Sequence, residues 1–261
     1  MRPLAFCSIA FRDEPVAQVW QRVAEIGYDA IELFWGHLER LNDERLGELA
    51  AQGRGWNCPA LVLSPYLCFT RGGEEFEQSL ARLRRVVHAA HILGATKIRT
   101  FVDVGPTGIA SAAATEAQWA DGLKGLRMAA AMDRELTFLL ETHENTLADC
   151  SAGVQRICDE VAAPNLKLLV HPDGHGDFAG MKGYHRWAAR IDHMHLKNHT
   201  PDGEATWVEQ GVFDHAAFFA DLAEAGYAGS LAVEYCWRGA TWQNAADAHA
   251  WLRDCLARAG R

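Results

Sequence analysis

The stretch VAQVWQRVAEIGYDAIELF, residues 16–34, contains the unit that decides the fold. Its first half places apolar side chains three or four residues apart, which is the spacing of one buried helical face. Gly27 follows at the point where helices often end in a left-handed residue. The apolar run at residues 30–34 is typical of a short strand covered on both faces. The stretch therefore predicts a helix followed closely by a buried strand.

The same unit recurs along the 261 residues, with Gly94 and Gly226 marking two further helix ends. The predicted strands are Leu4–Ala10, Ala30–Phe34, Ala60–Leu63, Lys97–Val102, Leu136–Glu141, Leu166–His171, His193–Lys197 and Ser230–Tyr235. Closure of eight such strands is favoured over a very wide open sheet, because a barrel has no exposed edge. We therefore predict an α/β fold, a (β/α)8 TIM barrel, as a single domain over residues 1–261.

Composition and charge limit the cellular setting and the partners. The formal net charge is −9, and no stripe of Lys and Arg follows a path that a nucleic acid could contact. No small-residue cleavage site follows the apolar stretch at residues 4–10, no long apolar span lies downstream, and the seven cysteines form no CxxC pair. We expect a soluble cytoplasmic protein with reduced thiols and with neither nucleic acid nor membrane as a partner, and a homo-oligomer remains open. Phosphate-binding glycine motifs are absent, which disfavours dinucleotide and P-loop folds.

Polar residues at the ends of the last four strands are the main functional signal. They are Glu141, His171, His195 and Glu234. The carboxyl ends of barrel strands surround the catalytic mouth, so these side chains are expected to converge. Any one of them alone is as often a structural cap or ion-pair partner, but four in succession favour function.

Two carboxylates and two imidazoles suit one divalent metal ion, Mn²⁺, Co²⁺, Zn²⁺ or Mg²⁺, as the cofactor. Such an ion polarises a substrate carbonyl, and Glu141 and Glu234 are then placed to act as the catalytic acid and base. Further polar residues near the same strand ends are candidates for substrate contacts. These are Arg99, His143, Asp173, His175 and Lys197. For Arg99, binding a substrate anion and neutralising the glutamates are equally good interpretations.

The chain resembles the xylose isomerase-like barrel superfamily, in particular its sugar phosphate isomerase/epimerase branch. The resemblance rests on residues 24–33, 140–143, 193–198, 209–214 and 225–234. It implies one divalent ion held by Glu, Asp, His and Glu from strands five to eight, which carries over to Glu141, a strand-six residue, His195 and Glu234. It also implies that the two glutamates serve as acid and base on opposite faces of the substrate, and that His143 touches substrate.

The sequence departs from the family pattern at strand six. His171-Pro172 stands where the family has Asp-Pro, and Asp173 is an alternative ligand by a small register shift. An imidazole makes the site less negative and favours Zn²⁺, Fe²⁺ or Co²⁺ over Mg²⁺. Lys197-Asn198 and Glu209-Gln210-Gly211 depart from the family pattern as well, and these differences bear on the substrate.

Our leading hypothesis is an isomerase or epimerase of a small ketose, keto acid or cyclic polyol, which works by metal-assisted proton transfer next to a carbonyl. A dehydratase of a keto-inositol type substrate would need the same residues. A sugar-binding barrel that has lost its metal is a third hypothesis, motivated by His171. An apurinic endonuclease is disfavoured, because the third and fourth strands lack imidazoles and the chain is acidic.

Overall fold

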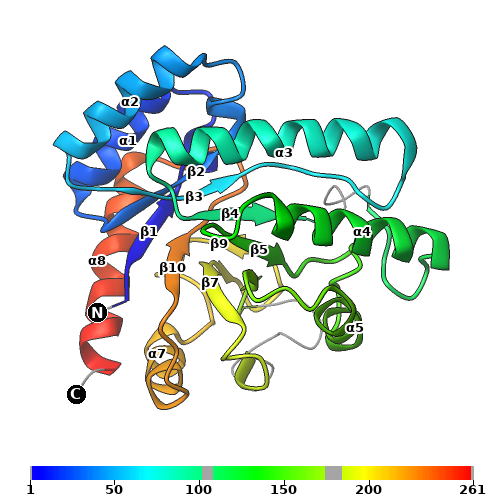
Figure 1. Ribbon diagram of the computed structural model, residues 1–261. Helices are drawn as coiled ribbons and strands as arrows, with labels where there is room; N and C mark the ends of the chain where they lie inside the picture. The colour runs from blue at the N-terminus through cyan, green and yellow to red at the C-terminus, as the bar shows by residue number, and fades with distance from the viewer. Residues whose placement is uncertain (1, 102–107, 174–183, 260–261) are drawn as a thin grey trace.

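Eight parallel strands close into a barrel surrounded by helices in the computed structural model, which describes residues 2–101, 108–173 and 184–259 (Figure 1). The strands are β1 (Leu4–Cys7), β2 (Ala30–Phe34), β3 (Ala60–Ser64), β4 (Lys97–Thr100), β5 (Thr137–Glu141), β6 (Leu166–Val170), β7 (Ile191–Leu196) and β10 (Ser230–Val233). Their order around the barrel is β1-β10-β7-β6-β5-β4-β3-β2, and every pair is parallel. The predicted (β/α)8 barrel is confirmed.

The helices follow the strands as the periodicity predicts. They are α1 (Val16–Ile26), α2 (Asp43–Gly55), α3 (Gly73–Leu93), α4 (Glu116–Met132), α5 (Ser151–Val161), α7 (His215–Glu224) and α8 (Trp242–Ala259). Gly27 and Gly94 end α1 and α3 with φ of 104° and 74°, the left-handed values that glycine adopts without a Cβ clash. No helix in the described ranges is both long and apolar enough to cross a membrane.

Some strand ends differ from the prediction. β1 stops at Cys7, three residues early, because residues 8–11 turn into the short 3-10 helix η1 (Ser8–Phe11). The Ser8 hydroxyl accepts a hydrogen bond from the Phe34 backbone N–H at 2.9 Å and holds this turn against the end of β2. After β7, residues 198–206 form a small antiparallel pair, β8 (Asn198–His199) with β9 (Ala205–Thr206).

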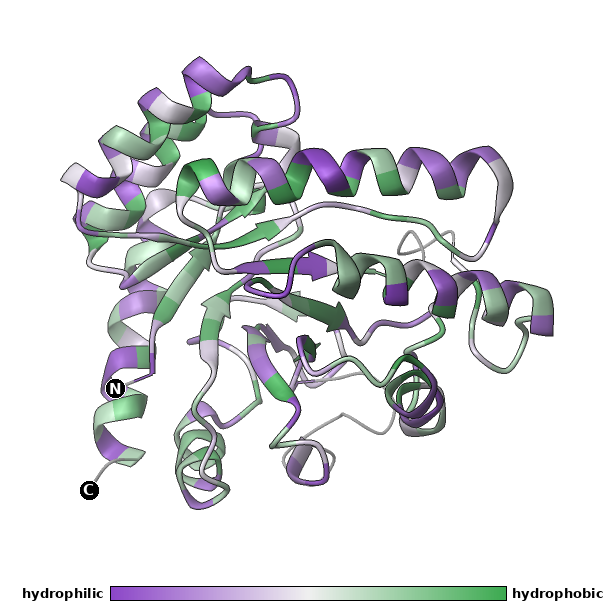
Figure 2. Ribbon diagram, in the orientation of Figure 1, coloured by the Kyte–Doolittle hydropathy of each residue, from purple (hydrophilic) through white to green (hydrophobic). Residues whose placement is uncertain are grey.

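The core has an outer layer and a lumen, and this division positions the site. Large apolar side chains fill the space between the strands and the helices, and hydrophobic and hydrophilic segments alternate along the helices (Figure 2). Inside the barrel the apolar clusters are small: Ala5, Ala30 and Ala232 form one, and Val62, Leu139 and Leu169 form another. The lumen also contains buried charged and polar groups, which is unusual for interior positions and indicates a site.

Candidate metal centre

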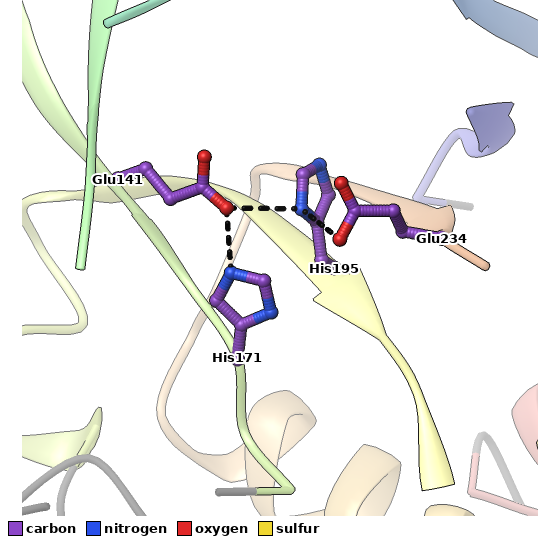
Figure 3. Close-up of side chains that lie close together, drawn as sticks. All are labelled: Glu141, His171, His195 and Glu234. Carbon is purple, nitrogen blue, oxygen red and sulfur yellow. Dashed lines mark hydrogen bonds and ion pairs between the residues drawn. The ribbon is translucent and has the colours of Figure 1, made fainter. Parts of the chain in front are cut away.

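Four side chains from consecutive strands meet at the carboxyl end of the barrel. Glu141 is the last residue of β5, His171 follows β6, His195 lies in β7 and Glu234 follows β10. Their side chains point toward one another (Figure 3), and one ligand atom from each lies within 4.8 Å of the others. All four are at most 1% exposed. The structure thus brings together the residues proposed as metal ligands.

The contacts within this cluster centre on His195. Its Nδ1 lies 3.2 Å from Glu234 Oε2 and 3.6 Å from Glu141 Oε1. Glu141 Oε1 is also 2.7 Å from His171 Nε2. Two carboxylate oxygens and two imidazole nitrogens therefore face a common point.

Two cations, one buried and one partly exposed, flank the glutamates. Arg99 Nη1 lies 3.2 Å from Glu141 Oε2 and 3.6 Å from Glu234 Oε1. Its guanidinium also lies 4.8 Å from the ring centroids of Tyr66 and of Phe101, within cation–π distance. Lys197 Nζ is 2.6 Å from Glu234 Oε2. Arg99 therefore contacts both glutamates, which is the arrangement that its neutralising interpretation requires.

These contacts fix the charge states. Burial alone would raise the pKa of Glu141, but Arg99 and the hydrogen bond to His171 hold that pKa well below its usual value. The pKa of Glu234 is likewise well below normal, because His195 and Lys197 outweigh burial. Burial opposes the charge on His195, yet Glu234 and Glu32 raise its pKa well above normal. By contrast, burial and then Lys197 lower the pKa of His171 to about 3.

The donor set fits a divalent metal ion. Carboxylate oxygens and imidazole nitrogens bind Mn²⁺, Fe²⁺, Co²⁺ and Zn²⁺, and His171 is neutral, as a ligand must be. Among the described residues, His195 Nδ1 is buried without a hydrogen-bond partner although two carboxylate oxygens face it. A buried nitrogen in this state is usually satisfied by something bound. Glu141, His171, His195 and Glu234 could therefore hold one ion.

The predicted substrate-contact residues lie at different depths. Lys197 and Arg99 touch the cluster, and Lys197 keeps 20% of its side chain exposed whereas Arg99 keeps 1%. The His143 ring is 6.2 Å from that of His171, and its Nδ1 lies 2.9 Å from the Glu144 carbonyl oxygen. Burial raises the pKa of Asp173, which is not in the four-residue cluster. His175 lies outside the described residues.

Sequence reasoning did not single out a second buried group beneath the cluster. Glu32 Oε2 is 2.9 Å from both His195 Nε2 and His193 Nε2, and all three residues are fully buried. The signal was present, because His193 and His195 are two residues apart and must share the lumen side of β7. Glu32 is also a charged residue inside an otherwise apolar strand.

The sequence is similar to one protein-family model and to individual enzymes. A family model described as xylose isomerase-like TIM barrel matches residues 20–255. The chain is 27% identical to a 3-dehydroshikimate dehydratase of Bacillus anthracis over 209 residues, which are 74% of this chain and 71% of the relative. It is 29% identical to an inosose dehydratase of Geobacillus kaustophilus over 143 residues, 46% of each chain.

Solved structures show the same fold. An L-ribulose 3-epimerase superposes with a TM-score of 0.83 at 18% identity, covering 100% of this chain and 96% of the epimerase. A protein named IOLI, solved with a zinc atom, superposes with a TM-score of 0.78 at 16% identity over 98% of both chains. The named relatives and neighbours thus include dehydratases as well as epimerases, so these comparisons support the two reaction classes equally.

Proposed function

Because the chain belongs to the xylose isomerase-like TIM barrel family, we propose that it is a divalent-metal-dependent dehydratase. Its substrate is a small hydroxylated carbonyl compound that carries a carboxylate. The similarity to a 3-dehydroshikimate dehydratase over most of both chains supports this reaction class. The observation that carries the proposal is the charge balance of the buried site.

The buried charges of the metal-free site cancel. Three carboxylates are kept ionised by pKa values well below normal, and three cations oppose them. The carboxylates are Glu32, Glu141 and Glu234, and the cations are Arg99, Lys197 and His195. A divalent ion that binds through His195 displaces one proton and brings two charges. The loaded site therefore has one positive charge in excess.

His171 is the cause of this excess. An aspartate at its position, as in the family pattern, would cancel the extra charge. Asp173 lies two residues further on and is not among the four side chains of the cluster, and burial raises its pKa. A site with excess positive charge favours an anionic substrate over an uncharged sugar. Dehydroshikimate carries a carboxylate, whereas inosose and ribulose are uncharged.

Each residue then has a role in the dehydration. Glu141, His171, His195 and Glu234 would hold the ion, which supplies a Lewis acid for the substrate carbonyl. Lys197 is the partly exposed cation and binds the substrate carboxylate. Arg99 is enclosed by aromatic rings and keeps the glutamates ionised.

His143 is placed to move the proton. A carbonyl oxygen only accepts, so His143 Nδ1 donates to Glu144, and in that tautomer the accepting nitrogen of an imidazole is Nε2. This base takes the proton next to the carbonyl, a carbon–carbon double bond forms, and the hydroxyl on the next carbon leaves as water after receiving that proton. Glutamates with pKa values held this low are weak bases, which favours His143 for this step.

Epimerisation is the second candidate, supported by the two glutamates that flank His195 Nδ1 from β5 and the end of β10. In that reaction Glu141 and Glu234 exchange protons with opposite faces of one carbon, as we expected from the sequence. Such an enzyme would act on uncharged ketoses, and its proton transfer would not need His143.

The test compares substrates of different charge. Protein loaded with Mn²⁺ or Co²⁺ is incubated with 3-dehydroshikimate, inosose and ketopentoses, and products are followed by ultraviolet absorbance and chromatography. We expect an aromatic product from 3-dehydroshikimate only, lost in His143→Gln and with a raised KM in Lys197→Met. Lys124→Met, an exposed lysine on α4, is the matched control. Turnover of a ketose but not of 3-dehydroshikimate would establish the epimerase instead.

A further inference from the structure

A buried hydrogen-bonded group lies on the opposite side of His195 from the candidate metal site. Glu32 Oε2 lies 2.9 Å from His195 Nε2, while His195 Nδ1 faces Glu141 and Glu234. The two nitrogens of one ring thus serve two separate groups of residues. His195 and Glu32 are both fully buried, so bulk water does not reach the contact between them.

The contact with Glu32 determines which nitrogen of His195 is available as a ligand. An ionised carboxylate can only accept hydrogen bonds, so His195 Nε2 must carry a proton. The lone pair of the neutral ring is then at Nδ1, the nitrogen that points to the glutamates. Metal-bound histidines in proteins commonly have a carboxylate at the other nitrogen, which fixes the tautomer and the orientation of the ring.

Glu32 is itself held from two further sides. The Ser64 hydroxyl at the end of β3 donates to Oε1, and His193 Nε2 lies 2.9 Å from Oε2. His193 Nδ1 accepts from the Ser230 hydroxyl at 2.6 Å. Side chains of β3 and β7 therefore fix one carboxylate of β2, and Ser230 at the start of β10 supports it through His193.

The hydrogen-bonded network around Glu32 continues through the lumen to the amino ends of the strands. Lys97 Nζ lies 3.0 Å from Ser230 Oγ and 2.8 Å from Asp192 Oδ2. Lys97 is the first residue of β4 and Asp192 the second of β7, so this ion pair lies at the amino ends of the strands. The lumen thus contains a chain of hydrogen bonds from one rim to the metal ligand at the other.

We propose that Glu32 is a positioning residue that fixes the tautomer and ring orientation of His195 for metal binding, and that Ser64 and His193 hold Glu32 in place. The proposal rests on the proposed function in one respect, that the four-residue cluster binds a divalent ion. It adds a residue from β2 that touches neither the ion nor the substrate.

The competing interpretation is a second metal site, because Glu32, His193 and His195 also offer ligand atoms within 4.8 Å of one another. The observed bonding favours positioning. Both imidazoles donate to Glu32, and the remaining contacts of Glu32 and His193 are supplied by Ser64 and Ser230. A second ion would have to displace these protons and break these bonds.

The experiment is a Co²⁺ titration of the full chain, followed by calorimetry and by the visible absorption of the bound ion. Wild type is compared with Glu32→Leu, which removes every acceptor, and Glu32→Gln, which keeps one acceptor oxygen without the charge. The matched control is Ser79→Ala. It removes one buried hydrogen bond, from the Cys68 backbone N–H, outside the lumen.

We expect one Co²⁺ per wild-type chain, with the Kd raised about 10–100-fold in Glu32→Leu and less in Glu32→Gln. The absorption band should change in Glu32→Leu, because the ring of His195 is no longer fixed, and should be retained in Glu32→Gln and Ser79→Ala. If Glu32→Leu does not fold, the weaker binding of Glu32→Gln with an unchanged band is the deciding result.

Other outcomes separate the two proposals. Equal affinity and an equal spectrum in wild type and both Glu32 variants would overturn the positioning role and leave the proposed function intact. Two ions in wild type, one of them lost in both Glu32 variants, would make Glu32 a ligand and overturn its positioning role. No binding by wild type would remove the proposed function, and the positioning role with it.

Discussion

Arg99→Met is the substitution with the largest expected effect on the metal-free protein. The Arg99 side chain is 1% exposed and pairs with Glu141 at 3.2 Å and with Glu234 at 3.6 Å. Methionine fills much of the space but leaves two buried carboxylates without this cation. Breaking a buried pair on one side costs about 3–5 kcal/mol. For a chain of this size that lowers the Tm by about 6–20 °C.

The assay is thermal unfolding followed by circular dichroism, with a chelator and then with excess Mn²⁺. The deficit of Arg99→Met should shrink in Mn²⁺, because the ion supplies positive charge to the same carboxylates. The control is Arg238→Met, whose ion pair with Asp13 is 78% and 68% exposed and is worth less than about 1 kcal/mol. Equal Tm losses in the two variants, or a deficit that Mn²⁺ does not reduce, would refute the reasoning.

Three further predictions concern turnover, packing and pH. Glu234→Gln should fold but lose turnover by about 10²-fold, because it removes one of the carboxylates that would hold the ion, and an unchanged kcat would contradict this role. Gly125→Ala should lower the free energy of unfolding by about 1–3 kcal/mol, because the added Cβ would lie 2.2 Å from the Phe69 ring. Gly47→Ala should raise the free energy of unfolding by about 0.5–1 kcal/mol, because nothing lies within 4 Å of the added Cβ. Urea unfolding with the opposite order would contradict this packing. Burial lowers the pKa of His215 to about 4, so protonation of this side chain favours the unfolded chain. The neutral side chain contributes up to about 3 kcal/mol to the free energy of unfolding above pH 6.5, and this contribution should be lost as the pH falls toward 4. His215→Phe should make the free energy of unfolding depend less on pH in this range.

The fold was predictable because its signals are local. The helix, glycine and strand of residues 16–34 form within the stretch that encodes them, and Gly27 takes the left-handed conformation that the pattern predicts. The convergence of Glu141, His195 and Glu234 then follows from strand order and the closure of the barrel. Strand ends were less certain, and β1 stops three residues early because Ser8 bonds to the end of β2.

The deeper parts of the site depend on contacts that a sequence does not encode locally. Glu32 and His193 are 161 residues apart, and they meet only because the barrel closes. The role of Arg99 was open for the same reason, since pairing with glutamates on β5 and after β10 requires the lumen geometry. At strand six the sequence left His171 and Asp173 as alternatives, and in the structure the four-residue cluster includes His171 and not Asp173.

The most direct test of the metal centre is elemental analysis by inductively coupled plasma mass spectrometry. Wild type, Glu141→Ala and the surface variant Arg238→Met are reconstituted with Mn²⁺, Co²⁺ or Zn²⁺ and then dialysed. We predict close to one ion per chain in wild type and in Arg238→Met, and little or none in Glu141→Ala. Wild type that retains no metal, or Glu141→Ala that retains as much as wild type, would contradict the assignment of this site.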